Sequence, residues 1–205
     1  MDVTDAINKR CSIRRMKADP VEKEKIVKVL EAGRRAPSWG NTQPWRFIVV
    51  QDEAKRAELA RVGGQPQINA PVIIVCCATA DDFTKKGHGA ALDSLIPVGA
   101  MTEELKNIVL QNDVFAPYLQ GDAAMAMRAA EQLMIAVAYM TLEAVNQGLA
   151  TCWVGAIAPK EMQKAMNLPD NIFVHSVLPL GYADEDPRPR PRKDMDKIVW
   201  WEQYG

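Results

Sequence analysis

The sequence predicts an α+β fold with a central sheet flanked by helices. The run from Pro71 to Ala78 is continuously apolar, which is typical of a strand covered on both faces. Residues 47–50 and 173–182 are rich in β-branched and aromatic side chains and also predict strands. Residues 122–146 form the longest helical pattern, and because it is apolar nearly all round we expect this helix to be buried.

Length and composition favour one ordinary globular domain spanning residues 1–205, since single cores grow to about 250 residues before they split. The net charge of −1, with scattered Lys and Arg, gives no indication of nucleic-acid binding. The first residues lack the order of a signal peptide, and no apolar run is long enough to span a membrane. Four cysteines, two of them adjacent in an apolar run, do not form a disulfide pattern. We therefore expect a cytoplasmic protein with reduced thiols.

Several common site motifs are missing from the sequence. No Gly-x-Gly-x-x-Gly motif follows a strand, and no phosphate-binding loop with Gly-Lys-Ser/Thr is present. Two histidines without paired cysteines argue against a zinc enzyme, so no metal is expected. Ser12 and Ser38 lack the Gly-x-Ser-x-Gly setting of a hydrolase nucleophile.

The N-terminal segment predicts a short helix from Thr4 to Arg10, with Thr4 as its cap. Arg10, Ser12 and Arg14 follow at alternating positions, so an extended chain points all three the same way. Two guanidinium groups and a hydroxyl on one side suit a phosphate or carbonyl group. Taken alone, the run is more typical of a solvated basic loop. Cys11 lies in the same run, and only its backbone is expected to take part in such a contact.

A second helix is predicted to start at residues 19–22, where Asp19 can cap, Pro20 suits the first helical turn, and Glu22 completes a capping box. Its apolar face predicts packing against a sheet. The residues of that face are Ile26, Val29, Leu30 and Gly33. The helix is expected to end at Pro37, because proline disfavours helix at the residue before it.

The loop after Pro37 carries small and amide side chains, namely Ser38, Gly40, Asn41, Thr42 and Gln43. Amides both donate and accept hydrogen bonds, so two amides close together can contact a flat ligand edge that alternates donors and acceptors. The pyrimidine edge of a flavin has this pattern. The alternative interpretation is that Gly40 and Asn41 only serve the turn.

Residues 53–62 predict an amphipathic surface helix closed by Gly63 and Gly64. Cys76 and Cys77 are expected to be small core residues. Residues 81–121 resemble a variable insertion with a weak helical pattern at 103–110. His88, within it, is interpreted as an exposed loop histidine in preference to a residue near a cofactor.

The C-terminal third begins with Gly148 as the cap of the long helix, and residues 159–166 predict a short helix with Pro159 at its start. His175 is expected to be a satisfied structural residue within its strand. The tail at 187–193 is Pro-rich and basic, which is typical of an extended segment, and the chain ends in an apolar stretch at 198–201.

Two motifs together resemble the FMN-dependent nitroreductase family. The first is Arg10-Cys11-Ser12-Ile13-Arg14, and the second is Ala36-Pro37-Ser38-Trp39-Gly40-Asn41-Thr42-Gln43-Pro44-Trp45. The segments at 148–155 and 178–182 are also similar, so the resemblance covers nearly all 205 residues. It implies a central mixed sheet flanked by helices in an intertwined homodimer, with FMN at each subunit interface and the long helix within that interface. It also implies no nucleic-acid or membrane partner, and it makes residues 81–121 a lid-like insertion and residues 187–205 a C-terminal arm on the sister subunit.

The resemblance implies tightly bound FMN, NADH or NADPH as a transient reductant, and a nitroaromatic, quinone or activated-alkene acceptor reduced through flavin N5 by ping-pong kinetics. The cofactor-binding residues it implies are Arg10, Cys11, Ser12, Arg14, Pro37, Ser38, Asn41, Gln43, Val154, Gly155 and Arg192. Arg190 is the alternate to Arg192. No catalytic acid or base is singled out, because flavin N5 is the reactive centre. The alternatives are a flavin-fragmenting relative, a reductive dehalogenase relative, or a non-catalytic flavin-binding protein.

Within this set, the resemblance places Arg14 near N1 of the flavin, where its charge would stabilise the reduced ring. Arg10, Ser12 and Arg192 would hold the phosphate side. The backbone at Val154 and Gly155 would approach N5, since a glycine permits close approach. Family members carry an Asn-like side chain where this chain has Gln132, so Gln132 is not included among the expected site residues.

Overall fold

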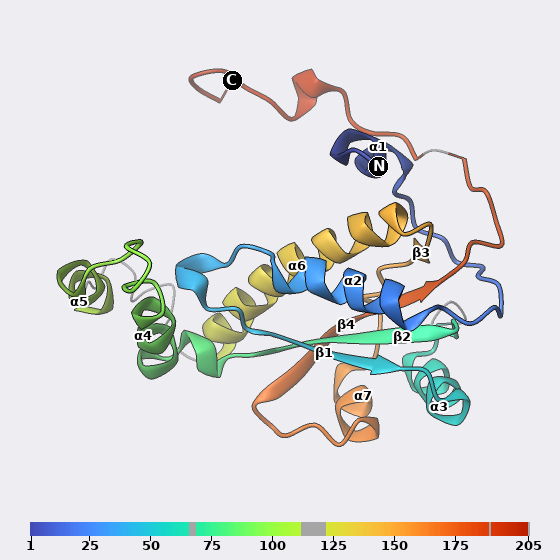
Figure 1. Cartoon of the computed structure of the whole chain (residues 1–205), viewed down its shortest axis with the longest axis horizontal. Coiled ribbons are helices and arrows are strands. Elements are labelled where there is room, and N and C mark those ends of the chain that lie inside the picture. Colours follow the sequence, from blue (N-terminus) through green and yellow to red (C-terminus); the bar gives the residue numbers. More distant parts are fainter. Residues whose placement is uncertain (66–68, 112–121, 189, 205) are drawn as a thin grey trace.

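The structure, a computed structural model, describes residues 1–65, 69–111, 122–188 and 190–204. A four-stranded sheet with strand order β1-β2-β4-β3 forms its centre (Figure 1). The strands are β1 (Trp45–Val50), β2 (Val72–Thr79), β3 (Ala150–Thr151) and β4 (Ile172–Gly181). The strands predicted from the sequence at 47–50, 71–78 and 173–182 are therefore confirmed.

All pairings between these strands are antiparallel. The sheet was expected to be mixed, and the parallel component in the described residues is the isolated bridge between Ser12 and Thr151. The register between β2 and β4 shifts between Cys76 and Cys77, as a β-bulge does. The N-terminal run thus joins the sheet at the edge formed by β3.

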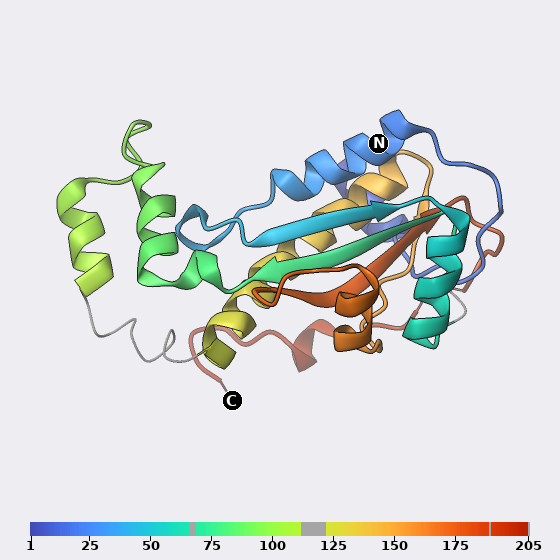
Figure 2. The same ribbon diagram turned by 90° about the horizontal axis from the view of Figure 1, so that it is seen from below.

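Helices cover both faces of the sheet (Figure 2). Figure 1 labels them α1 (Val3–Lys9), α2 (Lys23–Arg34), α3 (Glu53–Gly63), α4 (Lys85–Asp93), α5 (Glu103–Gln111), α6 (Asp122–Asn146) and α7 (Pro159–Ala165). The bounds of α6 are those of the predicted pattern, and its buried side chains, such as Leu133 and Met140, confirm that this helix lies in the core.

Strand β2 divides the core in two because successive side chains point to opposite faces. Ile74 and Cys76 belong to a cluster with α2 and α6, whereas Ile73 and Cys77 belong to a second cluster with α3 and α7. Every residue of β2 is buried, as predicted for a strand covered on both faces. The expectation that both adjacent cysteines are small core residues is confirmed.

Two helix starts differ from the prediction. The cap of α1 is Asp2, whose Oδ1 accepts a hydrogen bond of 2.8 Å from the N–H of Asp5, so Thr4 lies inside the helix. The second helix begins at Lys23, after an extended Glu22 that makes no side-chain cap. The carboxylate of Glu22 instead accepts a hydrogen bond from the Tyr182 hydroxyl, so a tertiary contact replaces the local capping box.

The part of the 81–121 segment that the structure describes is more helical than expected. The predicted helix near 103–110 is confirmed as α5, but α4 was not predicted, and residues 112–121 lie outside the described part. Gly87 and Gly89 weaken the helical pattern of α4. Gly87 is needed there, because a methyl group on it would lie 2.1 Å from the carbonyl oxygen of Asp81. The prediction of an exposed loop histidine is wrong, since His88 lies within α4 and is only 3% exposed.

Other local predictions have mixed outcomes. Gly64 and Gly148 cap their helices at φ 64° and 72°, and Pro159 starts α7, as expected. His175 is not fully satisfied, because its buried Nδ1 has no hydrogen-bond partner among the described residues. After β4 the chain runs into a C-terminal arm, described at residues 187–188 and 190–204, that leaves the body of the molecule (Figure 1). None of the described helices is both long enough and apolar enough to cross a membrane.

Candidate functional site

The N-terminal run lies along β3. The N–H of Ile13 donates a 3.0 Å hydrogen bond to the carbonyl of Thr151, and Ser12 pairs with the same residue in a parallel bridge. This places Arg10 and Ser12 on the wall of a pocket of about 420 Å³. The other walls come from α6 and from the segment after β3, namely Ala138, Thr141, Leu142, Thr151 and Trp153. Arg10 and Ser12 therefore border a common space, whereas Arg14, the third residue of the predicted alternation, is not among the residues that line it.

Glu185 fixes the backbone just beyond this pocket. Its carboxylate accepts hydrogen bonds from the N–H groups of Arg14 and Arg15, and the Arg15 guanidinium lies 3.6 Å from it. These backbone hydrogen bonds lower the pKa of Glu185 below its usual value. Sequence reasoning missed Glu185, because nothing local distinguishes it from the neighbouring acids Asp184 and Asp186. Its role depends on a contact across about 170 residues.

The thiols near the pocket have different environments. Cys11 is partly exposed within the run, whereas Cys152 is buried beside β3. Burial raises the pKa of Cys152, and the positive charge of Arg14 opposes that rise in part. Arg14 is itself exposed, and its charge is felt at both Cys152 and Glu185. The guanidinium of Arg14 therefore lies within electrostatic range of Cys152 and Glu185, and Arg14 is not among the residues that line the pocket.

The amide loop is held in a left-handed conformation at three positions. Gly40, Asn41 and Gln43 have φ values of 55°, 56° and 47°, which non-glycine residues rarely adopt. Internal hydrogen bonds hold this shape: the Gln43 N–H donates to Ser38 Oγ at 3.0 Å, and Gln43 Nε2 donates to Asn41 Oδ1 at 2.9 Å. The residues predicted to contact a flat ligand edge therefore form one preorganised unit.

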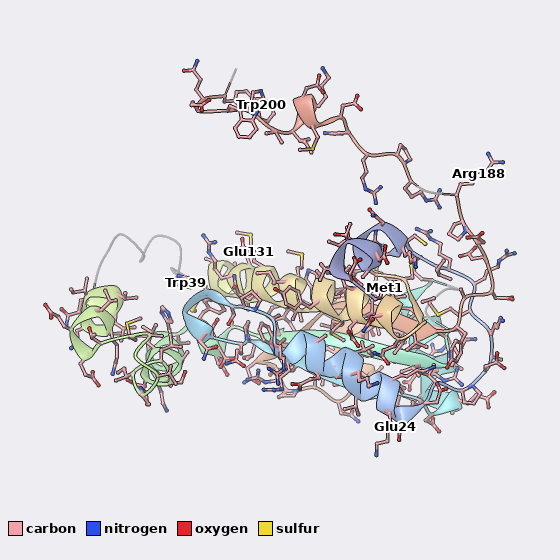
Figure 3. The ribbon with its side chains drawn as sticks, turned by 45° about the horizontal axis from the view of Figure 1, so that its top comes forward. Met1, Glu24, Trp39, Glu131, Arg188 and Trp200 are labelled. Carbon is pink, nitrogen blue, oxygen red and sulfur yellow. The ribbon has the colours of Figure 1, made fainter. Side chains whose placement is uncertain are left out.

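Gln132 joins this loop to α6. Its Oε1 accepts a 2.8 Å hydrogen bond from the N–H of Trp39 (Figure 3 shows Trp39 beside the end of α6 that carries Glu131). Gln132 is only 9% exposed, so the bond is largely shielded from water. This contact was not predicted, because Gln132 was not among the expected site residues. A polar residue in so apolar a helix was nevertheless a usable signal.

The segment after β3 contributes backbone and space. Val154 exchanges two hydrogen bonds of 3.0 Å with Val177, so its N–H is committed to the sheet. Gly155 is exposed, and a methyl group built on it would meet nothing within 4 Å. Of the two predicted positions, Gly155 is therefore the one that borders open space. Trp153 was not predicted as a site residue, although it lines the pocket and donates from Nε1 to Ser176 at 3.0 Å.

The expected site residues fall into two separate patches. Arg10 and Ser12 lie against α6 at Thr141, whereas the loop meets α6 at Gln132, nine residues earlier and so about 14 Å away along the helix. Ser38, Asn41 and Gln43 are not among the residues lining the pocket of Arg10.

Arg192 lies on the C-terminal arm, apart from the pocket lining, and donates to the carbonyls of Arg190 and Pro191, its own neighbours. Within the described part of one chain, these groups do not converge on a single pocket.

Metal chemistry finds no support in the same residues. In the described part of the chain, no group of three or more His, Cys, Asp or Glu side chains is arranged to hold a metal ion. The polar groups around the pocket are instead a guanidinium and hydroxyls, and the amides lie apart from them in the loop. Together these donors suit an organic anion with a flat polar edge.

Comparison with known proteins identifies the class. Residues 7–182 match the model of the Nitroreductase family, and the chain belongs to that family. A Thermus thermophilus relative named NADH dehydrogenase is 33% identical over 205 residues, covering 98% of this chain and 96% of that protein. A Bacillus subtilis relative named FMN reductase (NAD(P)H) is 27% identical, covering 99% of this chain and 74% of that protein. A candidate nitroreductase from Exiguobacterium sibiricum, solved with FMN, has the same fold at a TM-score of 0.82 with 22% identity, each chain covered to 98%.

Proposed function

We propose that the chain is an FMN-dependent NAD(P)H oxidoreductase. The observation that carries the proposal is the pocket of about 420 Å³ whose wall holds Arg10 and Ser12, in a chain of the Nitroreductase family. The relative named FMN reductase (NAD(P)H) supports both the cofactor and the reductant. The residues fit FMN, because its phosphate calls for cationic and hydroxyl donors and its ring edge calls for amides.

The residues divide the binding of FMN between them. Arg10 and Ser12 would hold the phosphate and ribityl side, with Arg192 from the arm joining them. Ser38, Asn41 and Gln43 would bind the polar edge of the ring. Arg14 would set a positive charge near N1, and the open space at Gly155 would admit the ring close to the backbone. Bound FMN supplies the redox chemistry itself, which is hydride transfer from NAD(P)H and onward reduction of the acceptor.

Two chains are needed to complete each site in this proposal. The loop and the arginine run are separate in one chain, and a homodimer would bring the loop of one chain to the pocket of the other. Exposed apolar side chains support this arrangement, since α6 exposes Met134 to 38% and Tyr139 to 43%. On the C-terminal arm, Trp201 is 79% exposed and Tyr204 is 83% exposed, as expected of an arm that packs on a second copy.

The helices α4 and α5 lie at the loop end of the molecule (Figure 2) and are proposed to form a lid over the acceptor side. The acceptor would be a nitroaromatic, quinone or activated alkene. NAD(P)⁺ would leave before this acceptor enters the same space, which gives ping-pong kinetics. A dehalogenating or flavin-fragmenting enzyme and a non-catalytic flavin-binding protein could use the same contacts, so the acceptor step has to be tested separately from flavin binding.

A mixed-chain experiment tests both the cofactor and the shared site. Arg10→Glu should abolish FMN binding at the arginine run, and Asn41→Ala should weaken it at the loop. If each site uses Arg10 from one chain and Asn41 from the other, a mixed dimer has one intact site and one doubly altered site. Random pairing makes half of the dimers mixed. Co-refolding the two variants should therefore restore full affinity to about a quarter of all sites. No restored binding would contradict the shared site. A wild-type protein that does not bind FMN would contradict the cofactor.

The redox step is tested with the wild-type holoprotein. Rapid mixing with NADH or NADPH should reduce the flavin, and a second mixing with a quinone or nitroaromatic should reoxidise it without oxygen. Reduction without reoxidation by any of these acceptors would favour the dehalogenating or flavin-fragmenting alternative. Failure of both steps would leave a binding protein and contradict the proposed enzyme.

A further inference from the structure

Helix α4 packs directly beneath the amide loop. His88 and Leu92, four residues apart on one face of α4, both meet Gly40. A methyl group built on Gly40 would lie 2.5 Å from Nε2 of His88 and 3.3 Å from Cδ2 of Leu92. The backbone of the loop therefore rests on the imidazole ring, at a place where only glycine leaves room.

The same imidazole contacts the residue before Gly40. The ring centroid of Trp39 lies 4.6 Å from that of His88, with an interplanar angle of 36°. It lies 6.0 Å from the ring centroid of Phe83, with an interplanar angle of 16°. Such offset ring contacts are favourable beyond the area they bury. His88 thus supports two successive residues of the loop, one through its backbone and one through its side chain.

A third contact from α4 reaches the amide pair. Asn41 Nδ2 donates a 3.1 Å hydrogen bond to the hydroxyl of Ser94, which follows the last turn of α4 and itself donates to Ala91. Because Asn41 Oδ1 accepts from Gln43, the orientation of both amides depends on where α4 holds the loop. An ion pair between Lys106 and Asp93 links α5 to the same end of α4.

The imidazole of His88 lacks a hydrogen bond that a buried polar ring usually makes. Its Nε2 atom is buried and has no hydrogen-bond partner among the described residues. Burial also lowers its pKa, so the ring is neutral near pH 7. A buried polar atom without a partner is unfavourable and calls for an explanation. The flat five-membered ring provides one, since it is thin enough to lie under Gly40 while it stacks on Trp39.

We propose that His88 is a positioning residue that holds Trp39 and Gly40, and through them the amides of Asn41 and Gln43, in the conformation that receives the flavin. The inference rests on the proposed function, because it assumes that these amides contact FMN. It further makes α4 and α5 one mechanical unit with the cofactor loop, so that a displacement of these helices changes flavin binding.

A double-mutant cycle with His88→Ala and Gly40→Ala tests the inference. The dissociation constant for FMN is measured by fluorescence titration, together with the absorption bands of the bound flavin and the melting temperature. His88→Ala should raise the dissociation constant by about tenfold and shift the bands. Gly40→Ala should weaken binding by at least a similar factor, because its methyl group collides with the imidazole and because alanine is also strained at the positive φ of this position. Lys86→Ala, an exposed change on the same helix, is the matched control and should leave the dissociation constant unchanged.

The double variant provides the decisive comparison. Removing the imidazole gives the new methyl group room, so the double variant should bind FMN distinctly better than the product of the two single effects predicts. Multiplicative effects, or a His88→Ala protein that binds FMN like the Lys86→Ala control, would overturn the inference while leaving the proposed function intact. If His88→Ala does not fold, His88→Asn takes its place in the cycle. Wild-type protein that does not bind FMN would instead contradict the proposed function.

Discussion

The backbone N–H of Trp39 and Oε1 of Gln132 are joined by a hydrogen bond of 2.8 Å between the amide loop and the central helix α6. The bond is local in space but spans 93 residues of sequence. This bond fixes the position of the loop along the axis of α6, and the imidazole of His88 packs against the ring of Trp39 in the same loop. The expected cofactor contacts of the loop therefore depend on two side chains outside it.

Gln132→Met should destabilise the protein. The change keeps the length of the side chain but removes the acceptor, leaving a partly buried N–H without its partner, which typically lowers the free energy of unfolding by about 1–3 kcal/mol. Denaturant unfolding measures the loss, and hydrogen exchange of the Trp39 amide should accelerate more than that of amides in β4. Equal exchange rates in the variant and the wild type would show that the bond does not hold the loop.

Arg10→Ala should weaken FMN binding by about 1–3 kcal/mol, the usual scale for a charge-assisted hydrogen bond. Lys9→Ala is the matched control, because Lys9 is exposed and lies at the end of the preceding helix. Flavin retention after dialysis and a fluorescence titration both measure the effect. An unchanged affinity in Arg10→Ala would remove the N-terminal run from the phosphate site.

Thiol labelling should distinguish Cys11 from the other three cysteines. Cys76 and Cys77 are fully buried, and burial raises the pKa of Cys77 to about 12. Cys152 is 3% exposed, and its pKa is also raised by burial. Because the thiolate is the reactive form, a thiol reagent should modify no more than one group per folded chain and all four in denaturant. Rapid labelling of two or more thiols, or labelling that survives Cys11→Ser, would contradict the buried positions.

Stability should fall as the pH drops below 6.5. Burial lowers the pKa of His88 from its ordinary value of 6.5, so well above pH 6.5 the ring is neutral in both states and has no effect. As the pH falls from 6.5, the unfolded chain binds a proton that the folded chain does not, so the free energy of unfolding decreases until the pH is below the folded pKa. The slope from this one group is at most about 1.4 kcal/mol per pH unit.

This pH effect can be assigned to His88 by comparison with His88→Ala, since other groups cancel in the difference. Glu31, whose pKa the guanidinium groups of Arg34 and Arg35 lower to about 2, acts only below its ordinary value of 4.5. Unfolding curves at several pH values between 7 and 5 measure the difference. A difference between the two proteins that does not change with pH would show that His88 is not buried as described.

Periodicity predicted the parts of the fold that one segment determines by itself. The long helix, the buried strand β2 and the strand β4 follow from apolar patterns of sufficient length, and the glycine caps at 64 and 148 follow from local backbone requirements. Both site motifs were also visible as sequence patterns, and the structure brings Arg10 and Ser12 to one pocket.

Contacts between distant segments were not predictable in the same way. Glu185 and Gln132 act through partners more than 90 residues away, and no local pattern identifies those partners, although the polarity of Gln132 in an apolar helix was a usable signal. The helix α4 was hidden because Gly87 weakens its pattern, although the close approach to Asp81 requires that glycine. His88 was therefore assigned to an exposed loop, and its contact with Trp39 became apparent only in the fold.

The most direct test of the account is the visible spectrum of the purified protein during anaerobic titration with NADH and, separately, with NADPH. We predict a yellow protein whose flavin bands bleach with at least one of the two donors and return when an acceptor is added. A colourless protein that also fails to bind added FMN would contradict the account at its centre.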